Sequence, residues 1–238
     1  MIAKQIHLNR SSDLWETSEM SPRIDFRSLT MRISAGLALG AGIGLAIGVG
    51  RPDPLAEYET VADSPAPDAM VWKLDPVHCM ALFRIHHVGA GQFWGMFDSV
   101  NGTMSWPENG EEAPVFDVTV DVESVHTGTP KLDRTIMSPQ FFNGKQFETV
   151  TFKSTGGTMT GEGKWDVTGD FTMHGVTKPL TAQVELTGVV GNPVQKKAGF
   201  EAKFILKRSD FDMTWGVKNQ ALGDEVLMIV GLEGDWVK

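Results

Sequence analysis

The sequence from residue 70 to residue 238 predicts an all-β domain, and three observations lead to this class. The first is a period of two: residues 116–123 (FDVTVDVE) alternate apolar and polar side chains, as in a strand with one buried and one wet face. The second is the short interval between turn signals such as Asn101-Gly102 and Gly191-Asn192-Pro193. The third is that strand patterns do not alternate with helix patterns, which argues against a parallel α/β fold. These features are typical of a β-sandwich or a closed β-barrel.

Later segments repeat this pattern, with two variations. Residues 183–187 (QVELT) and 200–207 (FEAKFILK) alternate in the same way. Residues 226–232 (VLMIVGL) are apolar throughout, which predicts a strand covered on both faces. Residues 129–139 instead predict one short helix, with Thr129 as N-cap, a proline at the first helical position and a second proline to end it. Such a helix can close one end of a barrel.

The N-terminal third predicts targeting. Residues 33–50 contain no charged side chain, and Arg23, Arg27 and Arg32 precede them. Basic residues upstream of an apolar run predict a cytosolic N-terminus and a C-terminal domain outside the cytoplasmic membrane. The run is longer than a usual signal-peptide core and short for a membrane span, so residues 31–50 are a signal peptide or a transmembrane anchor. Glycines at every fourth position from Gly36 to Gly48 would let two such helices approach closely.

The segments on either side of this run predict no folded structure. Residues 1–30 show no hydrophobic periodicity, and they are a cytosolic extension or lie upstream of a true start at Met31. Residues 51–69 hold four prolines among acidic and small residues, which predicts an extended linker. The barrel domain is therefore expected over residues 70–238.

Composition excludes several functions. The 238 residues carry a formal net charge of −9, which is unsuited to binding nucleic acid. Cys79 is the only cysteine, so neither an intramolecular disulfide nor a multi-thiolate zinc site is available, and a buried thiol is favoured over a reactive one. His86 and His87 are adjacent and point to opposite faces of a strand, and no metal site is expected. Phosphate loops, dinucleotide fingerprints and a G-x-S-x-G turn are absent, so no cofactor and no catalytic residue is predicted.

Short strings along the domain resemble the YceI-like, polyisoprenoid-binding family. Residues 72–78 (WKLDPVH) resemble its opening. The strings that follow in the family's order are 83–89 (FRIHHVG), 95–97 (GMF), 122–128 (VESVHTG), 138–142 (SPQFF), 152–154 (FKS), 169–172 (GDFT), 174–179 (HGVTKP), 208–211 (RSDF) and 223–226 (GDEV). The resemblance implies a lipocalin-like antiparallel barrel of eight strands, exported to the periplasm. It also implies that the barrel interior holds an isoprenoid chain, such as that of a polyprenyl phosphate or a quinone.

The sequence departs from the family pattern at three places. Cys79 replaces a serine, Leu132-Asp133 replaces an Arg-Asp pair, and Gln140 replaces an acidic residue. If the family's arginine helps to bind a phosphate head group, that contact is lost here or has shifted to Arg134. An isoprenoid tail is therefore a firmer expectation than a diphosphate head.

The candidate site is a ligand space inside the barrel. An eight-stranded barrel either fills itself with side chains or holds one small ligand. Burying a prenyl tail against phenylalanines yields about 0.8 kcal/mol for each CH₂ group, while histidines and a charged pair could orient a polar head. The candidate ligand-binding residues are His78, Phe83, His87, Phe93, Phe97, Phe116, Asp133, Arg134, Phe141, Phe142, Phe152, Phe171 and His174.

The main hypothesis is a carrier or sequestering protein for an isoprenoid-type lipid. One alternative is an enzyme that acts on such a lipid with histidine and Asp133 as acid–base groups. Another is a closed barrel that has no ligand space and binds a partner through an outer apolar patch. The expected partners are the lipid and, if residues 31–50 are uncleaved, the membrane; a homodimer is left open.

Overall fold

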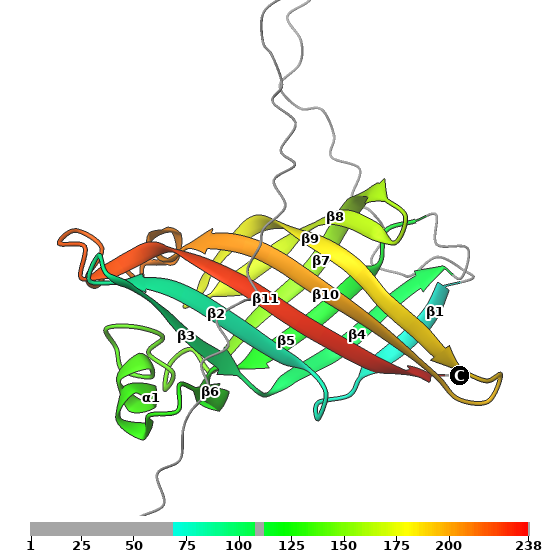
Figure 1. Ribbon diagram of the computed structural model, residues 1–238, viewed down its shortest axis with the longest axis horizontal. Coiled ribbons are helices and arrows are strands. Elements are labelled where there is room, and N and C mark those ends of the chain that lie inside the picture. Colours follow the sequence, from blue (N-terminus) through cyan, green and yellow to red (C-terminus); the bar gives the residue numbers. More distant parts are fainter. Residues whose placement is uncertain (1–68, 108–111, 238) are drawn as a thin grey trace, which may run out of the picture. The chain divides into compact units, whose positions relative to one another are not determined.

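The computed structural model describes residues 69–107 and 112–237 (Figure 1). The predicted extension, hydrophobic segment and most of the linker lie outside the described residues. No helix in the described part of the chain is long and apolar enough to cross a membrane.

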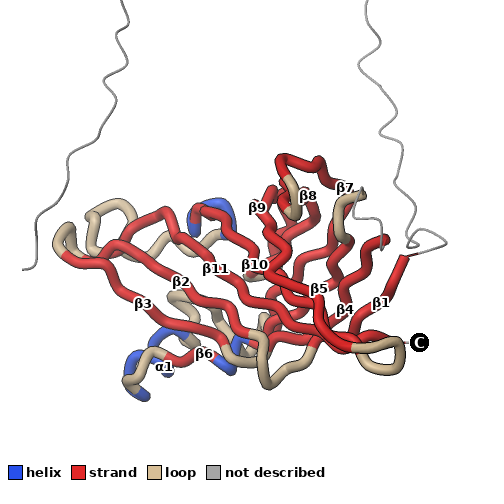
Figure 2. The backbone as a smooth tube through the Cα atoms, turned by 45° about the vertical axis from the view of Figure 1, so that its right-hand side comes forward, coloured by secondary structure: helices blue, strands red, loops and turns tan. Residues whose placement is uncertain are grey.

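The described chain is built mainly of strands (Figure 2). The strands are β1 (Ala69–Leu74), β2 (Met80–His87), β3 (Gly91–Phe97), β4 (Val100–Pro107), β5 (Val115–Asp121), β6 (Val125–His126), β7 (Thr149–Gly161), β8 (Lys164–Met173), β9 (Val176–Gly191), β10 (Lys196–Lys207) and β11 (Leu222–Val237). One α-helix, α1 (Pro130–Ile136), and two 3₁₀ turns, η1 (Val122–Ser124) and η2 (Arg208–Phe211), complete the secondary structure of these residues.

The strands form one antiparallel sheet that closes on itself. Closure occurs where β1 pairs with both β4 and β11. The first part of β11 pairs with β2, and β3 pairs with β2 and β6. β1 and β2 are therefore two parts of one bent strand, as are β3 with β4 and β5 with β6. Counted in this way the sheet is a closed eight-stranded barrel, which confirms the predicted fold class.

One end of the barrel interior is filled by aromatic rings. Trp72, Trp106 and Trp165 are buried there, and the ring of Phe200 lies 5.5 Å from that of Trp106 and 6.3 Å from that of Trp165, measured between centroids. Phe116 packs edge-on against the same Phe200 ring at 5.5 Å. The three indole N–H groups have no hydrogen-bond acceptor within the described ranges, so ring packing holds this end together.

The helix lies at the opposite end of the barrel from β1 (Figure 1). It begins at Pro130 after Thr129 and ends before Pro139, which confirms the predicted helix. Thr129 occupies the N-cap position but makes no side-chain cap hydrogen bond. The carboxylate of Asp133 instead accepts hydrogen bonds from the backbone N–H and the hydroxyl of Thr127, at 2.9 and 2.6 Å, and so ties the first turn to the preceding loop.

The prediction that residues 226–232 are covered on both faces is wrong for the outer face. Val226 and Leu232 are buried inside the barrel, whereas the outward side chains of Leu227 and Ile229 are only half-buried. Their outward neighbours are mixed: Ile229 lies between Leu82 and Lys203, and Leu227 lies between Arg84 and Ile205. The long aliphatic stems of Arg84 and Lys203 can cover part of this apolar surface while their charges stay in water, so the outer face needs no second layer.

Candidate functional site

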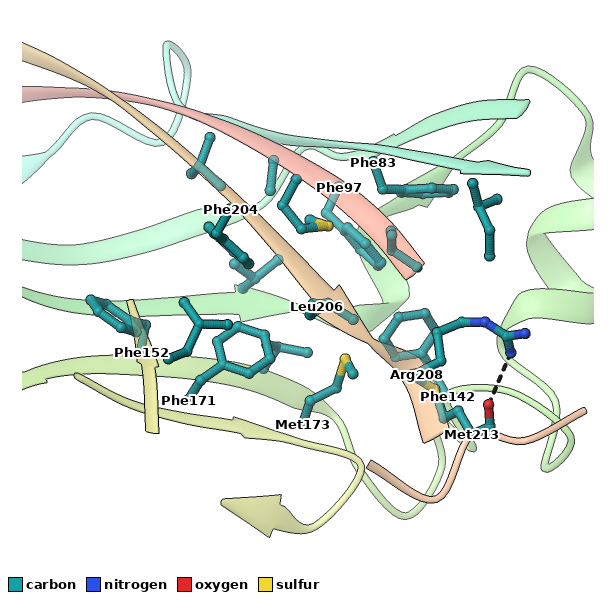
Figure 3. A pocket seen from close by; sticks show the side chains of 18 of the residues that line it. Phe83, Phe97, Phe142, Phe152, Phe171, Met173, Phe204, Leu206, Arg208 and Met213 are labelled. Carbon is teal, nitrogen blue, oxygen red and sulfur yellow. Dashed lines mark hydrogen bonds between the residues drawn. The ribbon is translucent and has the colours of Figure 1, made fainter. Parts of the chain in front are cut away.

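The end of the barrel near α1 is hollow and holds a cavity of about 500 Å³ (Figure 3). Side chains from β2, β3, β5 and β7 to β11 form its wall, and residues of α1 and of the loop after η2 complete it. The wall is almost entirely apolar; its few polar members include His87, Thr135, Thr151 and Arg208. This size and this composition are typical of a site for an apolar small molecule.

Most of the residues that the sequence named as candidates line this cavity. They share inward positions on strands, or lie on the segment that follows α1. They are Phe83, His87, Phe93, Phe97, Phe116, Phe141, Phe142, Phe152 and Phe171. The rings contact each other along the wall: those of Phe83 and Phe97 are 5.8 Å apart, and those of Phe97 and Phe142 are 5.4 Å apart.

Two glycines allow large rings to lie close to the wall. Phe83 in β2 is the direct cross-strand partner of Gly95 in β3, and a Cβ atom on Gly95 would overlap the Phe83 ring, with Cε1 at 2.7 Å. A Cβ atom on Gly169 in β8 would lie 2.6 Å from Cζ of Phe152. Because neither glycine has a side chain, both rings can occupy space beside the backbone, and more of the barrel centre stays empty.

Small side chains widen the cavity just above the filled end. Ala81 in β2 and Ala202 in β10 are both register partners of Val230 in β11, and all three line the cavity. Phe200, two residues before Ala202 on the same face of β10, belongs to the aromatic filling. The change from Phe200 to Ala202 therefore marks the floor of the cavity.

His78 does not line the cavity and lies in the turn between β1 and β2. Its Nδ1 is 2.8 Å from Oδ2 of Asp75, and this hydrogen bond is the main reason why the pKa of Asp75 falls from 3.8 to about 2. Glu233 joins the group, and three such side chains could in principle hold a metal ion. However, the ammonium of Lys197 lies 3.3 Å from Asp75 and 2.9 Å from Glu233, so these carboxylates already have a cation.

His174 also lies outside the cavity wall. With Gly175 it forms the turn between β8 and β9, and both residues have positive φ angles, of 53° and 76°. Its Nδ1 donates to the carbonyl oxygen of Phe211 at 3.0 Å, and its ring packs on Phe147 at 4.6 Å. These contacts give His174 a structural role in joining the turn to η2.

Asp133 and Arg134 lie on α1, but neither lines the cavity. Asp133 is held by Thr127, as described above, and Arg134 is exposed. Both border a separate, more polar hollow together with Asp121 and Glu148. The helix instead turns Leu132, Thr135 and Ile136 toward the cavity.

Arg208 lines the cavity but was not among the candidate residues. Only 4% of its surface is exposed. One signal was available: Arg208 continues the inward series on β10 formed by Phe204 and Leu206, spaced by two residues. Met213 and Trp215, from the loop after η2, also line the cavity without being predicted, because the path of a loop is not encoded in a strand period.

These observations define a class: a closed eight-stranded β-barrel that encloses an apolar cavity at the end near α1. Residues 72–233 match the family model of the YceI-like domain, and the chain belongs to this family. It is 35% identical over 158 residues to Protein YceI of Salmonella arizonae, which covers 66% of this chain and 81% of that relative.

Solved structures show the same fold. BcnA from Burkholderia cenocepacia is 22% identical, with a TM-score of 0.59 over 67% of this chain and 98% of that chain. The YceI protein from Campylobacter jejuni is 24% identical, with the same TM-score over 65% of this chain and 91% of that chain. A polyisoprenoid binding domain from Saccharophagus degradans is 15% identical, with a TM-score of 0.54 over 70% and 98% of the two chains.

Proposed function

We propose that this protein binds an isoprenoid-type lipid in its barrel and carries or sequesters it outside the cytoplasmic membrane. The observation that carries this proposal is the hollow apolar half of the barrel. The structural likeness to a protein described as a polyisoprenoid binding domain supports the choice of lipid class. The basic residues ahead of the apolar segment at 33–50 support export.

The cavity volume indicates how much of a lipid tail it can enclose. A methylene group is about as large as a water molecule, whose share of liquid volume is about 30 Å³, so 500 Å³ holds about 17 such groups. This corresponds to at least three isoprene units. Burying fifteen carbons yields about 12 kcal/mol before costs, and association costs about 4–15 kcal/mol. The gain for this tail exceeds the cost over most of that range without a charged contact, whereas the gain of about 4 kcal/mol for a single isoprene unit does not exceed even the lowest cost.

The arrangement favours binding over catalysis. Of the histidines considered as acid–base groups, only His87 lines the cavity, and His78 and His174 are held by structural contacts elsewhere. The carboxylate of Asp133 is likewise hydrogen bonded to Thr127. These groups do not meet at one place where a lipid head could react.

Lipid extraction tests the proposal. The full chain is purified from its own host and extracted with organic solvent, and the extract is analysed by mass spectrometry. We expect one isoprenoid-type lipid in a near-stoichiometric amount. The variant Ala202→Phe places a ring above the cavity floor and should lose most of this lipid. Ile205→Phe is the matched control, because Ile205 is on the outer face of the same strand and is 62% exposed.

The outcomes separate the hypotheses. A wild-type protein without lipid, or an Ala202→Phe variant with as much lipid as wild type, would contradict ligand binding in the barrel. Cell fractionation tests the location. Recovery of the protein in the cytosolic fraction would contradict its export.

A further inference from the structure

Arg208 is a buried cation at the end of the cavity near α1, and its hydrogen bonds go to backbone carbonyls. Nε donates to Gly223 at 2.9 Å, and Nη1 donates to Met213 at 3.0 Å (Figure 3). Nη2 donates to Trp215 at 3.1 Å and to Leu222 at 3.4 Å. Arg208 thereby holds the loop that leads into β11. These four hydrogen bonds use four of the five N–H groups of its guanidinium.

The charge of Arg208 has no close carboxylate partner. No Asp or Glu within the described ranges lies within 4.0 Å of its guanidinium, and the second N–H of Nη1 has no acceptor there. Asp224 acts on this charge without contacting it, and its two carboxylate oxygens accept from the N–H and the hydroxyl of Ser209 at 2.9 and 2.7 Å. Burial lowers the pKa of Arg208, and Asp224 opposes this effect. An arginine stays charged nevertheless, so the cavity has a fixed positive charge in its wall.

The two ends of the cavity therefore differ in character. The floor consists of apolar side chains such as Phe116 and Ala202, and the indole N–H groups of the filled end are not part of the wall. At the other end, Arg208 is joined by His87, which is the register partner of Leu222. An amphiphile in this cavity has a tail that favours the floor and a head that favours Arg208.

We propose that Arg208 forms a subsite for an anionic head group, a phosphate or a carboxylate, of the lipid bound in the barrel. This inference rests on the proposed function and adds the class of head group and the orientation of the lipid. An oxygen of the head group accepts from the remaining N–H of Nη1, and its negative charge offsets the buried cation. The loop carbonyls fix the guanidinium in place, so little ordering is needed when the head group binds.

Matched ligands that share one tail test this subsite. The full chain is titrated with farnesyl phosphate, farnesoic acid and farnesol, and binding is followed by the fluorescence of the tryptophans, of which Trp215 lines the cavity. We expect wild type to bind the two anions about tenfold to a hundredfold more tightly than the alcohol, as for a hydrogen bond to a charged group. A preference for only one of the two anions identifies that head group. Arg208→Met should reduce the ratio to about one, because the affinity lost with the guanidinium falls mainly on the two anions.

A second measurement does not depend on the folding of that variant. The ¹⁵N–¹H signal of Arg208 Nε in the wild-type protein should shift with farnesyl phosphate or farnesoic acid and stay in place with farnesol. Equal affinity of wild type for all three ligands, an unmoved signal, or a preference for anions retained by Arg208→Met would overturn the subsite. If wild type binds none of the three ligands, farnesol included, the proposed function itself is overturned.

Discussion

The substitution Gly95→Ala tests how the barrel keeps its centre open. A methyl group at this position would overlap the Phe83 ring, whose Cε1 atom would lie 2.7 Å from it. Ordinary contact between carbons is about 3.5–4.0 Å, so the ring has to move away from β3. Phe93 and Phe97 flank it along the wall, with centroids 6.4 and 5.8 Å away, so the free direction is into the cavity.

The expected effects follow from this displacement. Overpacking a core typically costs about 1–3 kcal/mol in the free energy of unfolding. A ring that moves into the cavity also displaces one or two methylene groups of a bound tail. At about 0.8 kcal/mol for each group, binding should weaken about fourfold to fifteenfold. Urea denaturation measures the first effect, and titration with a tail that fills the cavity, such as farnesol, measures the second.

Two further variants complete this experiment: one is a control, and the other tests whether a smaller side chain at position 83 restores binding. Gly231→Ala, in β11, adds a methyl group that meets no atom within 4 Å, and it should retain both stability and affinity. Phe83→Leu in the Gly95→Ala background shortens the displaced side chain and should restore much of the affinity. If Gly95→Ala binds and unfolds like wild type, or if the double variant recovers nothing, the contact between Gly95 and Phe83 does not set the width of the cavity.

Two other predictions concern the turn between β1 and β2. The pKa of Asp75 falls from 3.8 to about 2 in the folded state, mainly through the hydrogen bond from His78, so its contribution to stability is present above pH 3.8 and is lost as the pH falls through about 2. The difference in urea midpoint between wild type and Asp75→Asn should therefore narrow as the pH falls from 5 to 2, and a constant difference would contradict this. Burial raises the pKa of the Cys79 thiol, which also donates to the carbonyl of Glu233 at 3.2 Å. Cys79 should thus react with a thiol reagent only when the protein unfolds, and rapid labelling of the native protein would show that the site is open.

Strand periodicity predicted the inward-facing residues well, because alternation is a local property of the chain. Phe116 and Phe171 both follow from the parity of their strands, and both line the cavity. The same reasoning extended along β10 reaches Arg208, but a single basic residue at a strand end usually indicates a solvated charge. Its burial depends on carbonyls of Met213 and Leu222, whose positions are set by a loop and not by a sequence pattern.

The histidines show the opposite case, in which residues that the sequence singled out do not line the cavity. His78 and His174 stand out in a sequence because histidine is a frequent functional residue. Both also belong to strings that resemble the YceI-like family, residues 72–78 and 174–179. Both lie in turns between strands, where the backbone path decides what a side chain contacts. One turn brings His78 to Asp75, and the other brings His174 to Phe211, and each contact lies outside the cavity wall.

Aromatic content alone does not decide whether a barrel of this size is filled or hollow, since both outcomes occur in this one. At the filled end, Phe200 meets Trp106 and Trp165 across the interior. At the hollow end phenylalanines are more numerous, yet space remains, and Phe83 lies over Gly95. The small residues beside the rings therefore decide whether the barrel is filled or hollow. A ring that lies over a glycine sits close to the wall, and the volume at the barrel centre stays free for a ligand. In the sequence, such a glycine only lowers the expected stability of a strand. Its effect on the cavity can be inferred only when the strand register shows which ring lies beside it, as for Gly95 and Phe83.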